Sequence, residues 1–180
     1  MFLIKPHDVQ VIVIMTMAKF EIKDGAGIIP KGITEIPDSA FSSQEWLDSN
    51  ELKSVMIPDS ATRIGDCAFF GCKNLETITL PSNLTEIGEY AFYGCEKLTS
   101  IVIPNSVVGI GQAAFECCKS LKTITLPASL TKIGISLFFY CNALETIIVP
   151  GNCIEFFKKT LIEQGAFLHE PHPQIMALAE

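Results

Sequence analysis

The sequence lacks most of the residue types on which catalytic and nucleic-acid-binding sites depend. Its three histidines are His7, His169 and His172, so the long central part of the chain has none. Charged residues make up only 18% of the chain, and the 13 lysines and arginines are scattered without a basic run. Because the net charge is −7, attraction to nucleic-acid phosphates or anionic lipids has no basis here. We therefore expect no nucleic-acid partner.

Long apolar runs and catalytic motifs are missing as well. No apolar stretch approaches the ~20 residues of a membrane-spanning helix, so we expect no membrane insertion. No phosphate-binding glycine loop or nucleophile motif occurs in a strand-to-helix context. Prolines on both sides of His172 forbid the helix that would align it with His169. These absences predict a protein that is not an enzyme and has no cofactor and no metal site.

The apolar stretch from Val9 to Ala18 has two interpretations. Lys5 precedes it and small residues end it, as in a signal peptide. However, Asp8 lies at its edge and the run is rich in β-branched residues, which favours a strand. We favour a strand of an N-terminal cap, and the residues by themselves leave the location of the protein open.

What the sequence does have is one pattern that recurs every 23 residues. A fixed period of this length is typical of a solenoid, in which each repeat is one coil that buries its apolar side against the next. Proline, isoleucine-glycine, phenylalanine, cysteine and leucine all keep this period. The equivalent positions include Pro58, Pro81, Pro104, Pro127 and Pro150; Gly65, Gly88, Gly111 and Gly134; Phe69, Phe92, Phe115 and Phe138; and Cys72, Cys95, Cys118 and Cys141.

One coil can be interpreted residue by residue. Alternation after Leu75 predicts a strand with Ile78 and Leu80 inward, ended by a proline that cannot donate to the ladder. A second short extended piece ends at Gly88, for which we expect a positive φ. The Ala-Phe segment that follows is expected to form a compact helical turn around Phe92. Stacked coils then place the phenylalanines in a core column rather than in a functional aromatic stripe.

The seven cysteines fit the same stack. Each member of the cysteine column has two equivalent neighbours and no unique mate, which favours buried packing thiols. A disulfide framework is the weaker alternative, since the chain exceeds the short secreted scaffolds that need one. No CxxC spacing supports a metal site.

Two departures from the period are informative. Leu137 replaces the alanine that precedes the other column phenylalanines, so the last coil is expected to widen. The first coil carries five extra residues around Ser43 to Ser49, where a capping-box pattern predicts a short helix followed by Trp46. Trp46 is interpreted either as a lid over this insert or as an exposed anchor for a partner.

The repeat unit resembles that of a known family. It is similar to the BspA-like leucine-rich repeats, whose unit is roughly IPxSVTxIGxxAFxxC, and the best matches to it are Ile57 to Cys72, Leu80 to Cys95 and Ile103 to Cys118. The resemblance covers about residues 28–150. It implies an α/β solenoid, a right-handed stack with a parallel β-sheet on one face and short strands and helical turns on the other. It also implies a surface or secreted adhesion or interaction protein, with no catalytic or cofactor residues to carry over.

Both ends are interpreted as caps of this solenoid. Residues 1–27 are expected to form a strand or hairpin cap with a turn at Asp24-Gly25, and residues 28–150 five repeats. Residues 151–166 are expected to form a capping helix begun by Asn152 and ended by Gly165, and residues 167–180 a loosely ordered tail.

The most definite candidate site is the outward face of the longer strands. Its side chains carry hydroxyls and methyl groups with almost no charge, which fits a protein or peptide partner, although threonine is also simply a good exposed strand residue. A structural spacer and an intracellular protein-binding adaptor are the alternatives. The predicted binding residues are Ser54, Met56, Thr77, Thr79, Ser100, Val102, Thr123, Thr125, Thr146 and Ile148, together with Trp46.

Overall fold

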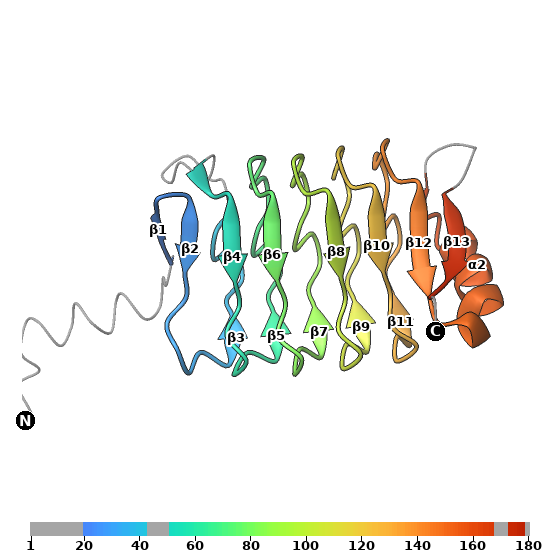
Figure 1. The fold of residues 1–180 in the computed structure, drawn as a ribbon, viewed down its shortest axis with the longest axis horizontal. Helices are drawn as coiled ribbons and strands as arrows, with labels where there is room; N and C mark the ends of the chain where they lie inside the picture. The colour runs from blue at the N-terminus through green and yellow to red at the C-terminus, as the bar shows by residue number, and fades with distance from the viewer. Residues whose placement is uncertain (1–19, 43–50, 168–172, 179–180) are drawn as a thin grey trace, which may run out of the picture.

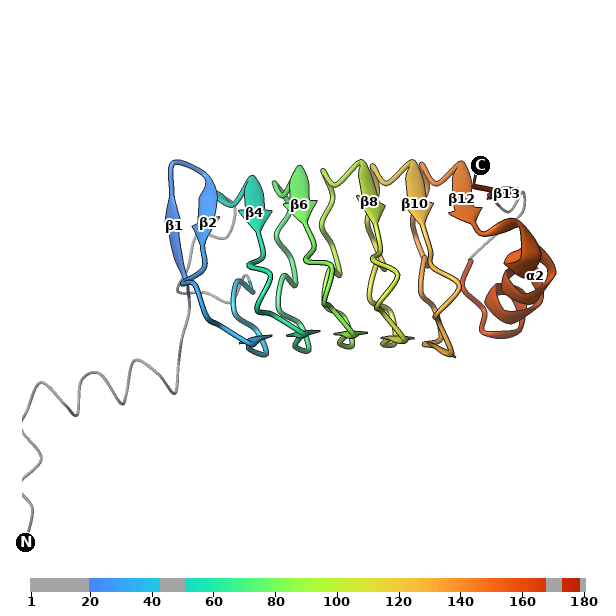
Figure 2. The same cartoon turned by 60° about the horizontal axis from the view of Figure 1, so that its bottom comes forward.

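The chain forms a solenoid in which successive coils lie side by side along the long axis (Figures 1 and 2). The computed structural model describes residues 20–42, 51–167 and 173–178. The proposed strand at Val9 to Ala18, the insert in the first coil and Trp46 lie outside these ranges. The predicted solenoid is confirmed, because the strands pair with their equivalents in neighbouring coils.

The longer strands line one face of the stack. Alternation along each of them places one side chain in the core between two outward ones, as the sequence predicts. β1 pairs antiparallel with β2, and every other pair on this face is parallel. The strands are β1 (Glu21–Lys23), β2 (Ala26–Ile28), β4 (Ser54–Met56), β6 (Thr77–Thr79), β8 (Ser100–Val102), β10 (Thr123–Thr125), β12 (Thr146–Val149) and β13 (Gln174–Ala177).

A second parallel sheet lies on the opposite side of the coils. Its five strands follow one another without interruption in the order β11-β9-β7-β5-β3. They are β3 (Glu35–Ile36), β5 (Arg63–Ile64), β7 (Glu86–Ile87), β9 (Gly109–Ile110) and β11 (Lys132–Ile133). This sheet corresponds to the second extended piece that the repeat predicted.

The Ala-Phe segments are tight turns and not the expected helical turns. Alternate N–H groups donate to the next coil, as from Cys67 to the carbonyl of Glu89 and from Phe69 to that of Ala91, both at 2.8 Å. The amide that follows them, that of Phe70, donates within its own turn to the carbonyl of Cys67 at 3.0 Å. A helix would direct all of these donors along its own axis. The turn therefore adds a third row of hydrogen bonds between coils.

The phenylalanine column runs through the core. The ring centroids of Phe69 and Phe92 are 5.2 Å apart, and those of Phe92 and Phe115 are 5.3 Å apart, with the rings almost parallel. Phe20 covers the N-terminal end of the column at 5.4 Å from Phe41. Burying each ring stabilises the fold by about 1.5–3 kcal/mol relative to exposure.

Leu137 widens the stack where the sequence predicts it. The ring centroids of Phe115 and Phe138 are 6.1 Å apart, and the rings are inclined by 23°. Leu137 is fully buried at the alanine position, so its larger side chain keeps the neighbouring coils from the closer approach seen elsewhere.

The cysteine column is confirmed as a row of packing thiols. Each thiol donates to a phenylalanine carbonyl of a preceding coil, as from Cys95 to Phe69 at 3.4 Å and from Cys118 to Phe92 at 3.2 Å. Burial raises the pKa of Cys72 to about 12. It also raises the pKa values of Cys95 and Cys118.

The repeat glycines are required for a different reason from the one the sequence suggested. Positive φ occurs two residues later in each coil, at 52° to 57° for Cys67, Tyr90, Ala113 and Ser136. The glycines instead lie against the backbone of the preceding coil. A Cβ on Gly111 would lie 2.5 Å from the amide nitrogen of Glu89. The expectation of positive φ at Gly88 was therefore wrong, and close approach is the cause.

The N-terminal hairpin and the C-terminal helix both form. Asp24 (φ 51°) and Gly25 (φ 82°) make the turn between β1 and β2. A short 3₁₀ helix, η2 (Gly151–Cys153), leads into α2 (Ile154–Glu163), whose N-cap is Cys153 with no side-chain cap. Asn152 therefore does not cap this helix. Gly165 ends the segment with a φ of 58°, as expected.

The segment that ends at Phe167 belongs to the stack. Ala166 is fully buried and accepts the N–H of Phe138, as each Ala-Phe segment does for the coil before it. Phe167 stacks on Phe138 at 6.0 Å. β12 and α2 therefore form a sixth coil, in which the helix replaces the second strand. Its Ala-Phe pair is displaced by six residues from the 23-residue period, which hid it in the sequence.

β13 adds a further strand after this coil. It pairs in parallel with β12 over four residues, and Ile175 lies beside Ile147 and packs on the core. Without β13, the backbone N–H and carbonyl groups at the outer edge of β12 would have no partners, and β13 forms hydrogen bonds with them. The expected loosely ordered tail is therefore wrong for Gln174–Ala177.

The close approach at the repeat glycines predicts a position-specific loss of stability. Gly111→Ala should lower the free energy of unfolding by about 1–3 kcal/mol, because backbone must shift to admit the methyl group. Gly109→Ala is the matched control: its Cβ would meet nothing nearer than 3.7 Å, and we expect unchanged or slightly higher stability. Urea denaturation measures both, and equal losses would contradict this explanation.

The raised thiol pKa values predict selective protection. At pH 8 only the thiolate reacts with iodoacetamide, so Cys72, Cys95 and Cys118 should be modified at least about 100-fold more slowly than the half-buried Cys153. Peptide mass spectrometry with and without denaturant measures these rates. Similar rates at all four sites in the folded protein would show that the column is open to solvent.

Candidate functional site

The predicted strand-face residues lie together on one surface. The sheet registers align Ser54 with Thr77 and Met56 with Thr79 on one side, and Thr123 with Ser100 and Thr125 with Val102 on the other. Two rows of outward side chains therefore cross the strands. The row nearer the strand starts is Ser54, Thr77, Ser100, Thr123 and Thr146, and the row nearer the strand ends is Met56, Thr79, Val102, Thr125 and Ile148.

The second of these rows exposes apolar side chains. Met56 is 73% exposed and Val102 is 67% exposed, whereas Thr125 and Ile148 are half-buried. Soluble proteins seldom align exposed large apolar residues unless a contact covers them. Trp46, the remaining predicted residue, lies outside the described residues.

β13 extends this face beyond the predicted residues. Gln174 lies beside Thr146, and the half-exposed Met176 lies beside Ile148. The sequence-based expectation of a loosely ordered tail leaves both residues out of the predicted site. The available signal was the alternation in Gln174–Ala177 directly after Pro173, which matches the alternation that precedes the proline of each repeat.

The face is divided between β6 and β8. The sequence predicts one continuous sheet, but the strands form two four-stranded sheets, β1-β2-β4-β6 and β13-β12-β10-β8. Figure 1 shows β6 and β8 farther apart than the other neighbours. A groove of about 600 Å³ lies there, lined by Glu76, Thr77, Ile78, Thr79, Leu80, Ser82, Thr99, Ser100, Ile101, Val102, Pro104 and Asn105. Glu76 is the one charged residue of this lining.

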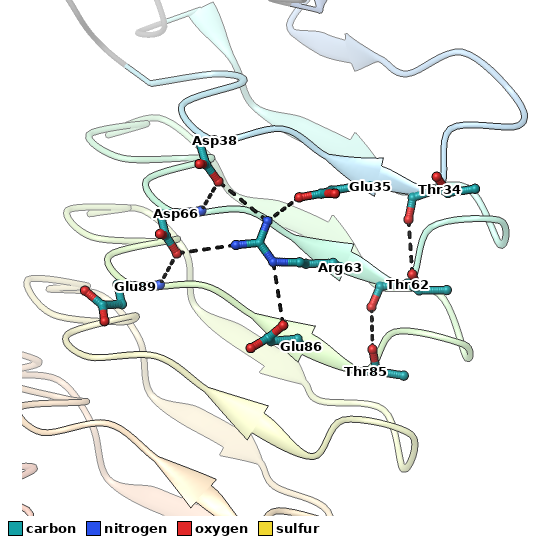
Figure 3. A network of polar contacts seen from close by, with 9 residues as sticks. All are labelled: Thr34, Glu35, Asp38, Thr62, Arg63, Asp66, Thr85, Glu86 and Glu89. Carbon is teal, nitrogen blue, oxygen red and sulfur yellow. Dashed lines mark hydrogen bonds and ion pairs between the residues drawn. The ribbon is translucent and has the colours of Figure 1, made fainter.

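Charge gathers instead on the other side of the coils. Arg63 on β5 forms an ion pair with Glu35 of the preceding coil and lies 3.6 Å from Glu86 of the following one (Figure 3). Its guanidinium is also 3.6 Å from Asp38 and 3.8 Å from Asp66. One cation thus links the carboxylates of three successive coils.

Two of these carboxylates also accept hydrogen bonds from the backbone of the next coil. Asp38 accepts the backbone N–H of Asp66 at 2.8 Å, and Asp66 accepts that of Glu89 at 2.9 Å (Figure 3). Burial works against the charge of Arg63, but its hydrogen bond with Glu35 and the surrounding carboxylates raise its pKa. The cluster therefore serves to hold coils in register.

Two titratable side chains beside the turns, Tyr93 and Cys67, have raised pKa values that favour their neutral forms. A hydrogen bond with Cys117, followed by burial, raises the pKa of Tyr93 to about 12. Burial, then the charge of Asp66, raises the pKa of Cys67. Within residues 20–42, 51–167 and 173–178, no three potential ligand side chains are placed to share a metal ion. In the same part of the chain no helix has the length and apolar character to span a bilayer.

Comparisons with known proteins agree with this architecture. A family model described as the BspA type leucine rich repeat region matches six copies over residues 34–167. A leucine rich repeat protein of T. pallidum is 36% identical, with a TM-score of 0.64 over 69% of this chain and 58% of its own. A leucine rich cell surface protein of Faecalibacterium prausnitzii is 40% identical, with a TM-score of 0.65 over 72% of this chain and 33% of its own. No curated protein matches the sequence significantly.

The chain thus spans 58% and 33% of the length of these two solved structures. The matched range, residues 34–167, contains every Ala-Phe or Leu-Phe turn from Ala40-Phe41 to Ala166-Phe167, the last of which follows α2. The repeat motif, the stacked coils and the family match all point the same way: the chain belongs to the BspA type leucine-rich repeat family.

Proposed function

We propose that this chain is a non-catalytic protein-interaction module that recognises a protein or peptide partner through its strand face. The observation that carries the proposal is the exposed row containing Met56 and Val102 on a face with almost no charge. Such a surface lowers its free energy by contact with a partner of similar polarity.

The opposite side of the coils supports this choice of surface. There the charged side chains of the Arg63 cluster pair with one another and with backbone amides, which leaves them well satisfied without a partner. Along β4, β6, β8, β10 and β12, all within the described residues, the outward side chains form no comparable ion pairs, since nearly all of them end in methyl or hydroxyl groups. Binding energy is therefore available on the strand face at a low cost in desolvation.

Adhesion is the form of this function that we favour. The similar Faecalibacterium protein is described as a cell surface protein, and the strand face fits recognition of a host or cell-surface protein. A structural spacer would use the stack for length alone, and an intracellular adaptor would use the same face inside the cell. The spacer is an outcome of the following test.

Charge introduced on the strand face should abolish recognition. Thr79→Arg combined with Thr125→Arg is expected to weaken partner capture by at least about tenfold, because two desolvated cations would have no counter-charge. Stability should change by only about 0.5 kcal/mol, since both sites are outside the core. Capture from host tissue and from cell-surface extracts, compared with thermal unfolding, measures the two effects.

The matched control places the same charges on the second sheet, which contains β7 and β11 and lies on the opposite side of the coils. Thr85→Arg with Thr131→Arg alters two exposed threonines before β7 and β11 and should leave capture unchanged. Equal capture by the strand-face variant and the unmodified protein would place the site elsewhere. Capture of nothing from either source would favour the spacer.

A further inference from the structure

The break between β6 and β8 leaves backbone groups without partners on both edges. Every other adjacent pair on this face is joined by ladder hydrogen bonds, and β6 and β8 are the two described neighbours that are not. In the equivalent positions of the next pair, Lys122 donates to Thr99 at 2.9 Å and Ile103 donates to Thr125 at 2.9 Å.

The orientation of the groups on β6 follows from its other edge. The N–H of Thr77 donates to Lys53 at 3.2 Å, and the carbonyl of Thr79 accepts the N–H of Ile57 at 3.0 Å. In a parallel ladder, alternate residues direct both backbone groups to opposite neighbours. The N–H and carbonyl of Ile78 therefore point toward β8, across the groove.

The same reasoning applies to β8. Thr99 and Ile103 use their backbone groups toward β10, so Ser100 and Val102 direct theirs toward β6. The groove thus presents N–H and carbonyl groups from both walls at the spacing of a strand. Leaving such groups unpaired at a partly desolvated site is unfavourable.

An independent observation is that the core is open at this place. Ile78 and Leu80, the inward residues of β6, are only partly buried. Their equivalents on the neighbouring strands, such as Ile101 and Ile103, are at most 4% exposed. A strand filling the groove would complete both the ladder and this apolar layer.

We propose that the groove between β6 and β8 binds an extended peptide segment of the partner, which adds to the split sheet as a strand. The proposal rests on the proposed function and specifies its site. An extended backbone is the occupant that offers donors and acceptors to both walls together. The uncharged walls select alternating hydroxyl-bearing and β-branched side chains, and Glu76 selects a basic residue near one end of the segment.

Binding would open the stack further as a wedge. On the opposite side β7 and β9 stay paired, with Glu86 beside Gly109 and Ile87 beside Ile110. This ladder can act as the hinge together with the adjoining Ala-Phe turn, whose hydrogen bond from Phe92 to Ala114 is also intact at 2.8 Å. Closing the strand side covalently should therefore prevent binding.

A disulfide across the groove tests this consequence. Thr79→Cys with Val102→Cys closes the gap on oxidation. The matched control, Gly109→Cys with Lys132→Cys, joins the paired strands β9 and β11 on the opposite side of the coils, outside the strand face. The probe is a fluorescent peptide of alternating threonine and valine flanked by lysines, followed by anisotropy. We expect the oxidised gap variant to bind at least about tenfold more weakly, with recovery on reduction, and the oxidised control to bind like the unmodified protein.

A second probe keeps the test independent of whether the disulfide forms. N-methylation of alternate residues removes the peptide's backbone donors but keeps its side chains, and should weaken binding by at least about tenfold. Equal binding of the two peptides, unchanged binding by the oxidised gap variant, or no binding of the first peptide would overturn the proposal.

The captured partner separates this inference from the proposed function. If Thr79→Arg with Thr125→Arg abolishes capture while the oxidised gap variant retains it, the strand face binds without the groove, and the inference alone fails. If neither change alters capture, both fail. If the double-arginine variant and the oxidised gap variant both lose capture while the control disulfide leaves it unchanged, the result supports the proposed function and the groove inference together.

Discussion

Everything in this structure depends on identical coils approaching one another closely enough for backbone to meet backbone. Three rows of hydrogen bonds, along the two strand faces and along the Ala-Phe turns, join successive coils, with the strand-face row interrupted between β6 and β8 and the second sheet ending at β11. The phenylalanine column fills the space between these rows at ring separations near 5.2 Å. Because each coil buries its apolar side only against its neighbours, the stack needs both the period and the covered ends.

The close approach explains residues that would otherwise look interchangeable. The repeat glycines are fixed by backbone of the preceding coil, and the buried thiols fill small spaces while giving their hydrogens to carbonyls of preceding coils. Where one side chain is larger than the pattern allows, at Leu137, the column opens by almost 1 Å in ring separation. The spacing is therefore set locally by the smallest side chains, and the aromatic rings follow it.

One side of the coils contributes to stability, and we assign recognition to the other, the strand face. The Arg63 cluster links three coils on one side, which secures register with charge that is already paired. The strand side carries methyl and hydroxyl groups in two rows, and it is also the side on which the stack is open. A surface that is uncharged, partly apolar and interrupted at a strand edge suits an extended partner better than a folded ligand or small molecule.

The sequence determined the features that repeat, because a period of equal steps allows one arrangement of equivalent residues. It predicted the solenoid, the aromatic and thiol columns, the widening at Leu137 and the outward strand residues. The sequence did not predict the sixth coil, because a helix interrupts the period before Ala166. It did not predict β13 either, because a single short alternating segment does not show that β12 has an edge free to pair with it. The role of the glycines and the break between β6 and β8 were decided only in three dimensions. Both depend on distances between backbones of different coils, and a sequence records which residues follow one another, not how closely successive coils approach.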